Sequence, residues 1–170
     1  AAGRALYAVT RTRIQQGKPV TPAFLFAVFL WQPVRERAAQ LEAEGQHAAQ
    51  ALQHAGSQII AEQASVMATP RRFSLPMREI WMLQLRLERK GGRRSLRVLG
   101  HPRFRAAYDF LLLRGEAGEV SKELGDWWTE FQEMHPEQRE QTVTRTHPGK
   151  RTRGRSRRKP GRKACPLELI

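Results

Sequence analysis

Residues 70–105 constrain the fold most, because this one stretch combines a helical apolar pattern with a high positive charge. It holds eleven Arg and Lys against two Glu, a net charge of +9. At 100° per residue its apolar side chains gather on one broad arc, while Arg78, Arg86 and Arg89 lie on the opposite arc. The arc is formed by Met77, Ile80, Trp81, Leu83, Leu85 and Leu87. The pattern predicts a helix that starts near Leu75 or Pro76, with one buried face and one cationic face.

The preceding residues also have helical spacing. A first helix, with Leu6 and Val9 on its apolar side, is expected to end at Gly17. Thr21 is a suitable N-cap for a second helix, because Pro22 then occupies the first helical position. This second segment is apolar on all sides, so we expect it at the centre of the core. Further helices are predicted over 34–45, after a kink or division at Pro33, and over 47–68.

The remaining segments continue the helical pattern. Gly91 and Gly92 are expected to end the cationic helix, and 93–100 is expected to be a basic connector. Further helices are predicted after His101-Pro102, through residue 116, and from Ser121. Sustained alternation of apolar and polar residues, which is typical of strands, is missing. The fold class is therefore predicted as all-α, a helical bundle that ends near residue 140.

Three parts are expected along the chain. These are a helical body over 1–68, an Arg-rich helical domain over 69–141, and a basic tail over 142–170. Between residues 145 and 163 the tail has no aliphatic side chain. Because such a sequence buries too little apolar surface to offset the entropy of ordering, we expect the tail to be disordered.

The overall composition points to an anionic partner. The net charge is +14 and the sequence pI is about 11.3, which favours nucleic acid or an anionic membrane surface. The longest apolar run, Ala23 to Trp31, has nine residues, whereas a membrane-spanning helix needs about 20, so we expect this run to be a core segment. Of the two anionic partners, nucleic acid is expected and a membrane is not. The single cysteine, Cys165, excludes an intramolecular disulfide and suits a reducing, cytoplasmic compartment. Since the chain starts with Ala1 in a helical pattern, we expect it to be part of a longer protein.

No arrangement of residues predicts catalysis or metal binding by this chain. A site for Mg²⁺ needs carboxylates close together, and the two aspartates, Asp109 and Asp126, fall on separate predicted helices. His47 and His54 are two helical turns apart, too far to share one metal. We therefore expect no catalytic residue, no metal and no cofactor here.

Aromatic residues at helical spacing allow two interpretations. Trp81, Trp127, Trp128 and Phe131 either pack in the core or stack on bases. Core packing is the more common use of such residues, and we expect it here.

The arginines of residues 70–105 and of the tail are the candidate RNA-binding residues. A solvated face and neutralisation by the acidic segment 106–144, with a net charge of −6, are the alternatives. Arginine favours phosphate because its planar guanidinium donates two parallel hydrogen bonds. With no duplex-recognition motif present, single-stranded RNA is the expected partner. The candidates are Arg71, Arg72, Arg78, Arg86, Arg93, Arg94, Arg97, Arg103, Arg105, Arg151, Arg153, Arg155, Arg157 and Arg158.

Three blocks resemble a known family. They are GKPVTPAFLFAVFLWQPVRER, PRRFSLPMREIWMLQLRLERKGGRR and HPRFRAAYDFLLLRGE, followed by WWTEFQE. In this order they resemble the C-terminal half of bacterial poly(A) polymerase, a polynucleotide adenylyltransferase related to tRNA CCA-adding enzymes. The resemblance covers about residues 1–140.

The resemblance implies a role in RNA 3′-end processing. In that family an N-terminal head holds Mg²⁺ and ATP, and the enzyme adds AMP to RNA 3′ ends, which marks transcripts for decay. This chain is similar to the helical body and the Arg-rich C-terminal domain, which help hold the RNA. It does not contain the Gly-Ser motif and metal-binding aspartates of the head, so we expect no catalysis by this chain alone.

Two other functions fit the same residues. One is a non-enzymatic RNA-binding or chaperone protein, which a start codon immediately upstream of Ala1 would favour. The other is a protein-interaction module, in which the acidic helices of 106–144 dock a partner from the RNA decay machinery.

Overall fold

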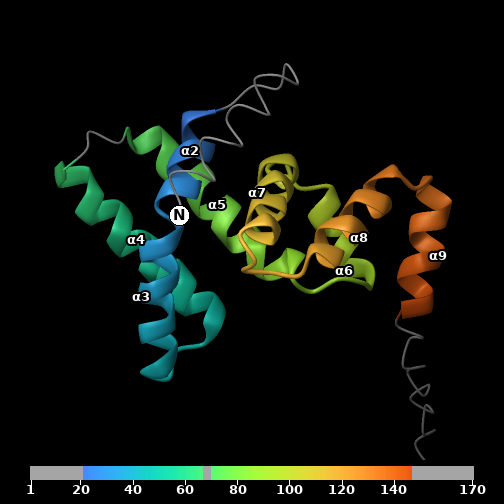
Figure 1. Ribbon diagram of the computed structural model, residues 1–170, viewed down its shortest axis with the longest axis horizontal. Coiled ribbons are helices and arrows are strands. Elements are labelled where there is room, and N and C mark those ends of the chain that lie inside the picture. The colour runs from blue at the N-terminus through green and yellow to red at the C-terminus, as the bar shows by residue number, and fades with distance from the viewer. Residues whose placement is uncertain (1–20, 67–69, 147–170) are drawn as a thin grey trace, which may run out of the picture.

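The computed structural model describes residues 21–66 and 70–146. Within these ranges the chain forms eight α-helices and no strand, which confirms the all-α prediction (Figure 1). The predicted first helix and the predicted disorder of 147–170 lie outside the described residues. The helices are α2 (Pro22–Phe29), α3 (Trp31–Ala43), α4 (Ala48–Val66), α5 (Arg71–Leu87), α6 (Arg93–Leu99), α7 (Phe104–Glu116), α8 (Lys122–Glu133) and α9 (Pro136–Thr146).

Two apolar clusters share helices α5 and α7. Figure 1 shows α2, α3 and α4 on one side of these two helices and α6, α8 and α9 on the other. Met77 and Trp81 of α5 belong to the first cluster, and Leu83 and Leu87 belong to the second. Helix α5 is therefore buried along two sides. The predicted boundary between body and Arg-rich domain, which precedes this shared helix, stays a prediction.

Helix α5 starts earlier than predicted. It begins at Arg71 with Pro70 as N-cap, and Pro76 lies inside it rather than at its start. A proline there removes only one helical hydrogen bond, the one to the Arg72 carbonyl. The Phe73 ring packs against Phe26 of α2, with ring centroids 6.1 Å apart. This contact with another helix, which local sequence does not reveal, stabilises the added turn.

Residues 93–99 form helix α6. The prediction of a basic connector at 93–100 is therefore wrong for these residues. Gly92 precedes the helix with φ +70°, a left-handed conformation that glycine adopts without strain. The Gly91 N–H donates to Ser95 Oγ, and this hydroxyl in turn donates to the Gly91 carbonyl. Val98 is buried in the second cluster, and its burial stabilises this short helix.

Helix α9 includes residues 142–146, which the sequence pattern had placed in the tail. Val143 is only 3% exposed because it packs into the second cluster. Arg139 also donates to the carbonyls of Phe131 and Gln132, which lie in the last turn of α8. These contacts with α8 and its neighbours hold a helix whose own sequence is mostly polar.

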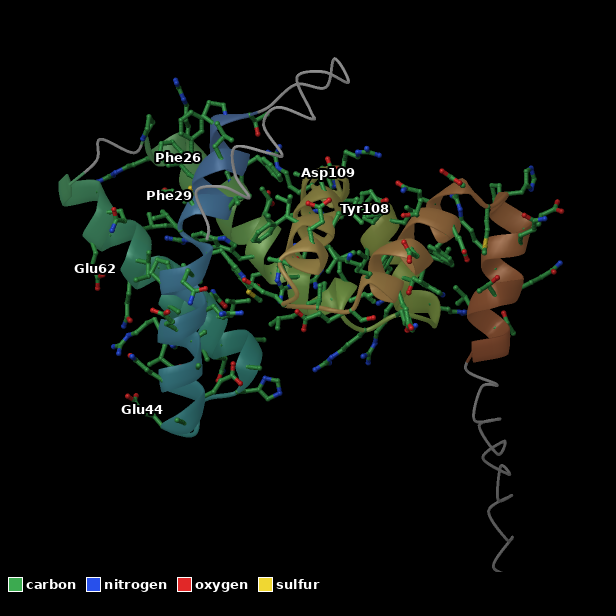
Figure 2. The ribbon with its side chains drawn as sticks, in the orientation of Figure 1. Phe26, Phe29, Glu44, Glu62, Tyr108 and Asp109 are labelled. Carbon is green, nitrogen blue, oxygen red and sulfur yellow. The ribbon has the colours of Figure 1, made fainter. Side chains whose placement is uncertain are left out.

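Helix α2 contributes to the first cluster, as expected, but it is not buried on all sides. Phe24 and Ala27 are buried, whereas Phe29 is 53% exposed. Figure 2 shows Phe26 and Phe29 on one side of α2. The expected division near Pro33 is confirmed, because α2 ends at Phe29 and Pro33 falls in the first turn of α3, where its missing N–H is not needed.

The tryptophans of α5 and α8 are core residues, as expected. Trp81 and Trp128 are buried, and each indole N–H donates to a backbone carbonyl, that of Ala27 and that of Leu87 respectively. Phe131 is buried beside Trp128, and Trp127, which is half-buried, stacks on Phe131. These rings are engaged in packing, so base stacking by Trp81, Trp128 and Phe131 is excluded.

A buried arginine connects α7 to the neighbouring helices. Arg114, 7% exposed, pairs with Glu88 at 2.8 Å and with Glu119 at 3.3 Å. It also donates to Gln84 Oε1, and its guanidinium lies 4.7 Å from the centre of the Trp31 ring. Because these partners come from α3, from the end of α5 and from the turn after α7, the network ties the two clusters together.

Candidate nucleic-acid interface

An open groove of about 430 Å³ lies where the start of α4 meets the second half of α5 and helix α6. We call it the α6 groove. His47 and the first residues of α4 form one end of it. Its other lining residues are Met82, Leu85, Arg86, Arg89, Arg94, Arg97 and Val98.

The spacing of these residues explains why they converge. Leu85 and Arg86 follow Met82 by three and four positions, which places the three on one side of α5, and Arg89 lies just beyond the end of that helix. Gly91 and Gly92 both have positive φ, and the turn that they form brings α6 back against α5. The groove is thus made by one helical face, one glycine turn and one short helix.

The four arginines of the α6 groove have no acidic partner within 21–66 and 70–146. Arg86, Arg89, Arg94 and Arg97 are exposed, and the described ion pairs involve other residues. Glu88, their nearest acidic neighbour in sequence, binds Arg114 instead. The positive end of the α4 dipole adds to the same potential, because Ala48 and Ala49 line the groove.

A second groove, of about 400 Å³, lies between the starts of α2 and α7 and the first half of α5. We call it the α2 groove. Arg103 pairs with Glu79 at 3.1 Å, and Arg105 pairs with Asp109 at 3.3 Å. The guanidinium of its third arginine, Arg72, lies over the Phe73 ring.

The two grooves lie on different parts of the molecule. In Figure 2, Asp109 and Tyr108 of α7 are in the upper half of the view, whereas Glu44, in the turn before α4, is in the lower half. Arg105 pairs with Asp109 and lies over the Tyr108 ring, so its side of the α2 groove lies in the upper half of the view. Six of the predicted arginines are therefore divided between two grooves.

The structure sorts the predicted binding residues. Of the fourteen, Arg86, Arg94 and Arg97 line the α6 groove, and Arg72, Arg103 and Arg105 line the α2 groove. Arg71 and Arg93 are exposed and line neither groove, and Arg78 is half-buried with an Nε that has no hydrogen-bond partner. The five tail arginines lie outside the described residues: Arg151, Arg153, Arg155, Arg157 and Arg158.

Sequence reasoning missed several lining residues. Arg89, on the predicted cationic arc, is not among the predicted binding residues, and neither are Met82, Leu85 and His47. The spacing of Met82, Leu85 and Arg89 from Arg86 in the sequence is the signal that could have identified these three. His47 is brought in by the packing of α4 against α5, which the sequence does not show.

The acidic segment does not neutralise the α6 groove. Asp109 pairs with Arg105, and Glu119 pairs with Arg35 and Arg114. The exposed carboxylates of α8 make no ion pair with the residues that the structure describes. They are Glu123, Asp126, Glu130 and Glu133.

The described residues do not suit Mg²⁺, which prefers several oxygen ligands around one point. Nowhere in 21–66 or 70–146 do three His, Cys, Asp or Glu side chains gather closely enough to hold a metal ion. Among the described helices, none has the length and apolar character needed to cross a membrane.

Comparison with known proteins identifies the family. Residues 44–163 match the family model described as "Polymerase A arginine-rich C-terminus". The chain belongs to this family. It is 40% identical over 146 residues to Poly(A) polymerase I of Haemophilus influenzae, which covers 82% of this chain and 32% of that protein. It is 38% identical over 162 residues to Poly(A) polymerase I of Escherichia coli O6:H1, which covers 90% and 34%.

The region matched by the family model contains the whole lining of one groove but not of the other. The chain spans about a third of the length of the curated relatives it matches. All lining residues of the α6 groove fall within residues 44–163, whereas Thr21, Ala23 and Phe24 of the α2 groove precede them. The predicted resemblance to the C-terminal part of bacterial poly(A) polymerase is confirmed.

Proposed function

We propose that this chain is the RNA-binding C-terminal part of a poly(A) polymerase that adds AMP from ATP to RNA 3′ ends. Mg²⁺ and ATP would be held by a catalytic head that this sequence does not contain, so the chain alone would be inactive. The place of action would be the bacterial cytoplasm, with single-stranded RNA as the partner and transcript decay as the outcome.

The arginines of the α6 groove carry the proposal. Four guanidinium groups converge on one concavity, and within the described ranges no carboxylate competes for them. A guanidinium held without a partner keeps its hydrogen-bond donors available to phosphate oxygens. Because single-stranded RNA carries one phosphate per nucleotide and bends easily, it can bring several phosphates into one groove.

The test is single-stranded RNA binding by the full chain as a function of salt. Replacing Arg94 and Arg97 with Gln removes two groove cations from the exposed side of α6. Each lost phosphate contact reduces the slope of log K against log salt by about 0.7, so the slope falls by about 1.4. At about 0.1 M salt the affinity then falls about 25-fold.

Arg103→Gln with Arg105→Gln is the matched control, since it removes the same two charges from the α2 groove, where both are paired. We expect it to change the slope by less than about half as much. Equal effects of the two double variants would mean that net charge, not the α6 groove, governs binding. A third variant, with the five tail arginines replaced by Gln, measures the contribution of the tail.

The α8 carboxylates favour a second candidate, docking of a basic protein from the RNA decay machinery. Four exposed acidic side chains of one helix, Glu123, Asp126, Glu130 and Glu133, are unpaired among the described residues. Replacing all four with Gln would abolish such docking and leave RNA affinity within about threefold. Loss of RNA binding instead would exclude this separation of roles.

A further inference from the structure

The α6 groove has an apolar floor beneath its cationic rim. Met82 and Leu85 of α5 are half-buried, and Val98 of α6 is buried. Phosphate binding by itself needs no such floor, because a phosphate is bound through charge and hydrogen bonds. The groove therefore combines a concave apolar surface with arginines from two segments of the chain.

We propose that this floor holds one unstacked nucleobase of single-stranded RNA, while the surrounding arginines hold the neighbouring phosphates. The proposal rests on the RNA-binding function proposed above and assigns a base subsite within the same groove. The faces of a nucleobase are largely apolar, and proteins bind unstacked bases between apolar, aromatic or guanidinium surfaces.

The arrangement of side chains fits a nucleotide rather than a bare phosphate chain. Arg86 follows Met82 by one turn of α5, Arg89 lies just beyond the end of that helix, and Arg94 and Arg97 line the groove from α6. A base on the floor therefore has guanidinium groups on two sides, within reach of the phosphates before and after it. The groove, at about 430 Å³, is large enough for a group of this size.

The same geometry disfavours a duplex. In a double helix the base faces are covered by stacking, so the floor would stay exposed to water and only the arginines would engage. An acidic peptide with one apolar side chain has comparable chemistry. The membership of this chain in a polymerase family favours RNA, and the experiment below decides between the two.

The test compares two polyanions on the full chain. One is oligouridylate of about 15 nucleotides and the other is inorganic polyphosphate with the same number of phosphates, both at about 0.1 M salt. Replacing Met82 and Leu85 together with Gln should lower the affinity for oligouridylate about fivefold and change that for polyphosphate less than twofold. Arg94→Gln with Arg97→Gln should lower both.

The outcomes separate this inference from the proposed function. If the floor variant binds oligouridylate as tightly as the parent, the base subsite is wrong even where the arginine variant loses affinity. That pattern would assign the floor to another ligand, such as an acidic peptide. If the arginine variant loses nothing, the proposed function itself fails.

A measurement on the unaltered chain tests the base subsite even if the Met82→Gln, Leu85→Gln variant does not fold. Oligouridylate is compared with an abasic ribose-phosphate oligomer of equal length at about 0.5 M salt, where the contribution of phosphate contacts is small. We expect the oligomer with bases to bind at least about fivefold more tightly. Equal affinities would overturn the base subsite.

Discussion

The α6 groove and the α2 groove hold similar numbers of arginines but differ in what those arginines contact. In the α2 groove Arg103 and Arg105 are paired with Glu79 and Asp109. In the α6 groove four arginines surround an apolar floor, and among residues 21–66 and 70–146 no carboxylate reaches them. Equal charge in the sequence therefore does not mean equal capacity to bind an anion.

The difference has a specific structural origin. Glu88 follows Arg86 and precedes Arg89 in sequence, yet its carboxylate turns to the buried Arg114 of α7. This pairing removes the one acidic side chain of the α5 C-terminus from the α6 groove. In the middle of α5, Glu79 remains available to Arg103. The position of α7 beside α5 thus decides which arginines stay open to a ligand.

The largest expected effect concerns Arg114, whose role is structural. Arg114→Ala leaves Glu88, Glu119 and Gln84 without their shared cation, and we expect the free energy of unfolding to fall by about 3 kcal/mol. Urea unfolding measures this. A loss below about 1 kcal/mol would show that the network does not tie the clusters together, since an exposed arginine such as Arg86 should cost no more than that.

A smaller effect is expected from opening the α2 groove. Glu79→Gln removes the partner of Arg103, which gives this groove one unpaired cation. We expect single-stranded RNA affinity at about 0.1 M salt to rise up to about fivefold, the contribution of one phosphate contact. Glu130→Gln on α8 makes the same change in net charge at a residue that lines neither groove. If both variants raise the affinity equally, pairing does not distinguish the grooves.

The smallest effect is expected from the Arg103–Glu79 pair on stability. The two side chains are 46% and 33% exposed, so water already solvates much of their charge. We expect Arg103→Gln to change the free energy of unfolding by less than about 1 kcal/mol. A loss comparable to that of Arg114→Ala would mean that this pair also holds the fold together.

The helices were predictable from sequence because their periodicity and their ends are local features. Thr21 with Pro22 marks the start of α2. Helix α5 ends at Leu87, about one turn before the two glycines that were expected to end it. The apolar arc of α5 correctly identified buried residues such as Met77 and Trp81. Each of these depends on residues within a turn or two of one another.

The errors arose where a distant contact decides the structure. The first turn of α5 depends on Phe73 meeting Phe26, helix α6 depends on burial of Val98, and the end of α9 depends on burial of Val143. For the site, sequence identified Arg86, Arg94 and Arg97, but the pairing of Arg103 with Glu79 required knowing that the start of α7 lies beside α5.

The most direct test of the account is to place one carboxylate inside the α6 groove. Ala49 lines the groove in the first turn of α4, and its neighbour Gln50 is exposed and does not line it. Ala49→Glu and Gln50→Glu make the same change in net charge, and both put an acid where it stabilises the start of a helix. Single-stranded RNA binding is measured over a series of salt concentrations.

We expect Ala49→Glu to lower the affinity for single-stranded RNA about fivefold or more at about 0.1 M salt, and to reduce the salt slope by about 0.7. Gln50→Glu should change the affinity less than about twofold. Both variants should unfold at the temperature of the parent or above it. Equal effects on RNA binding would contradict the claim that the unpaired arginines of the α6 groove hold the RNA.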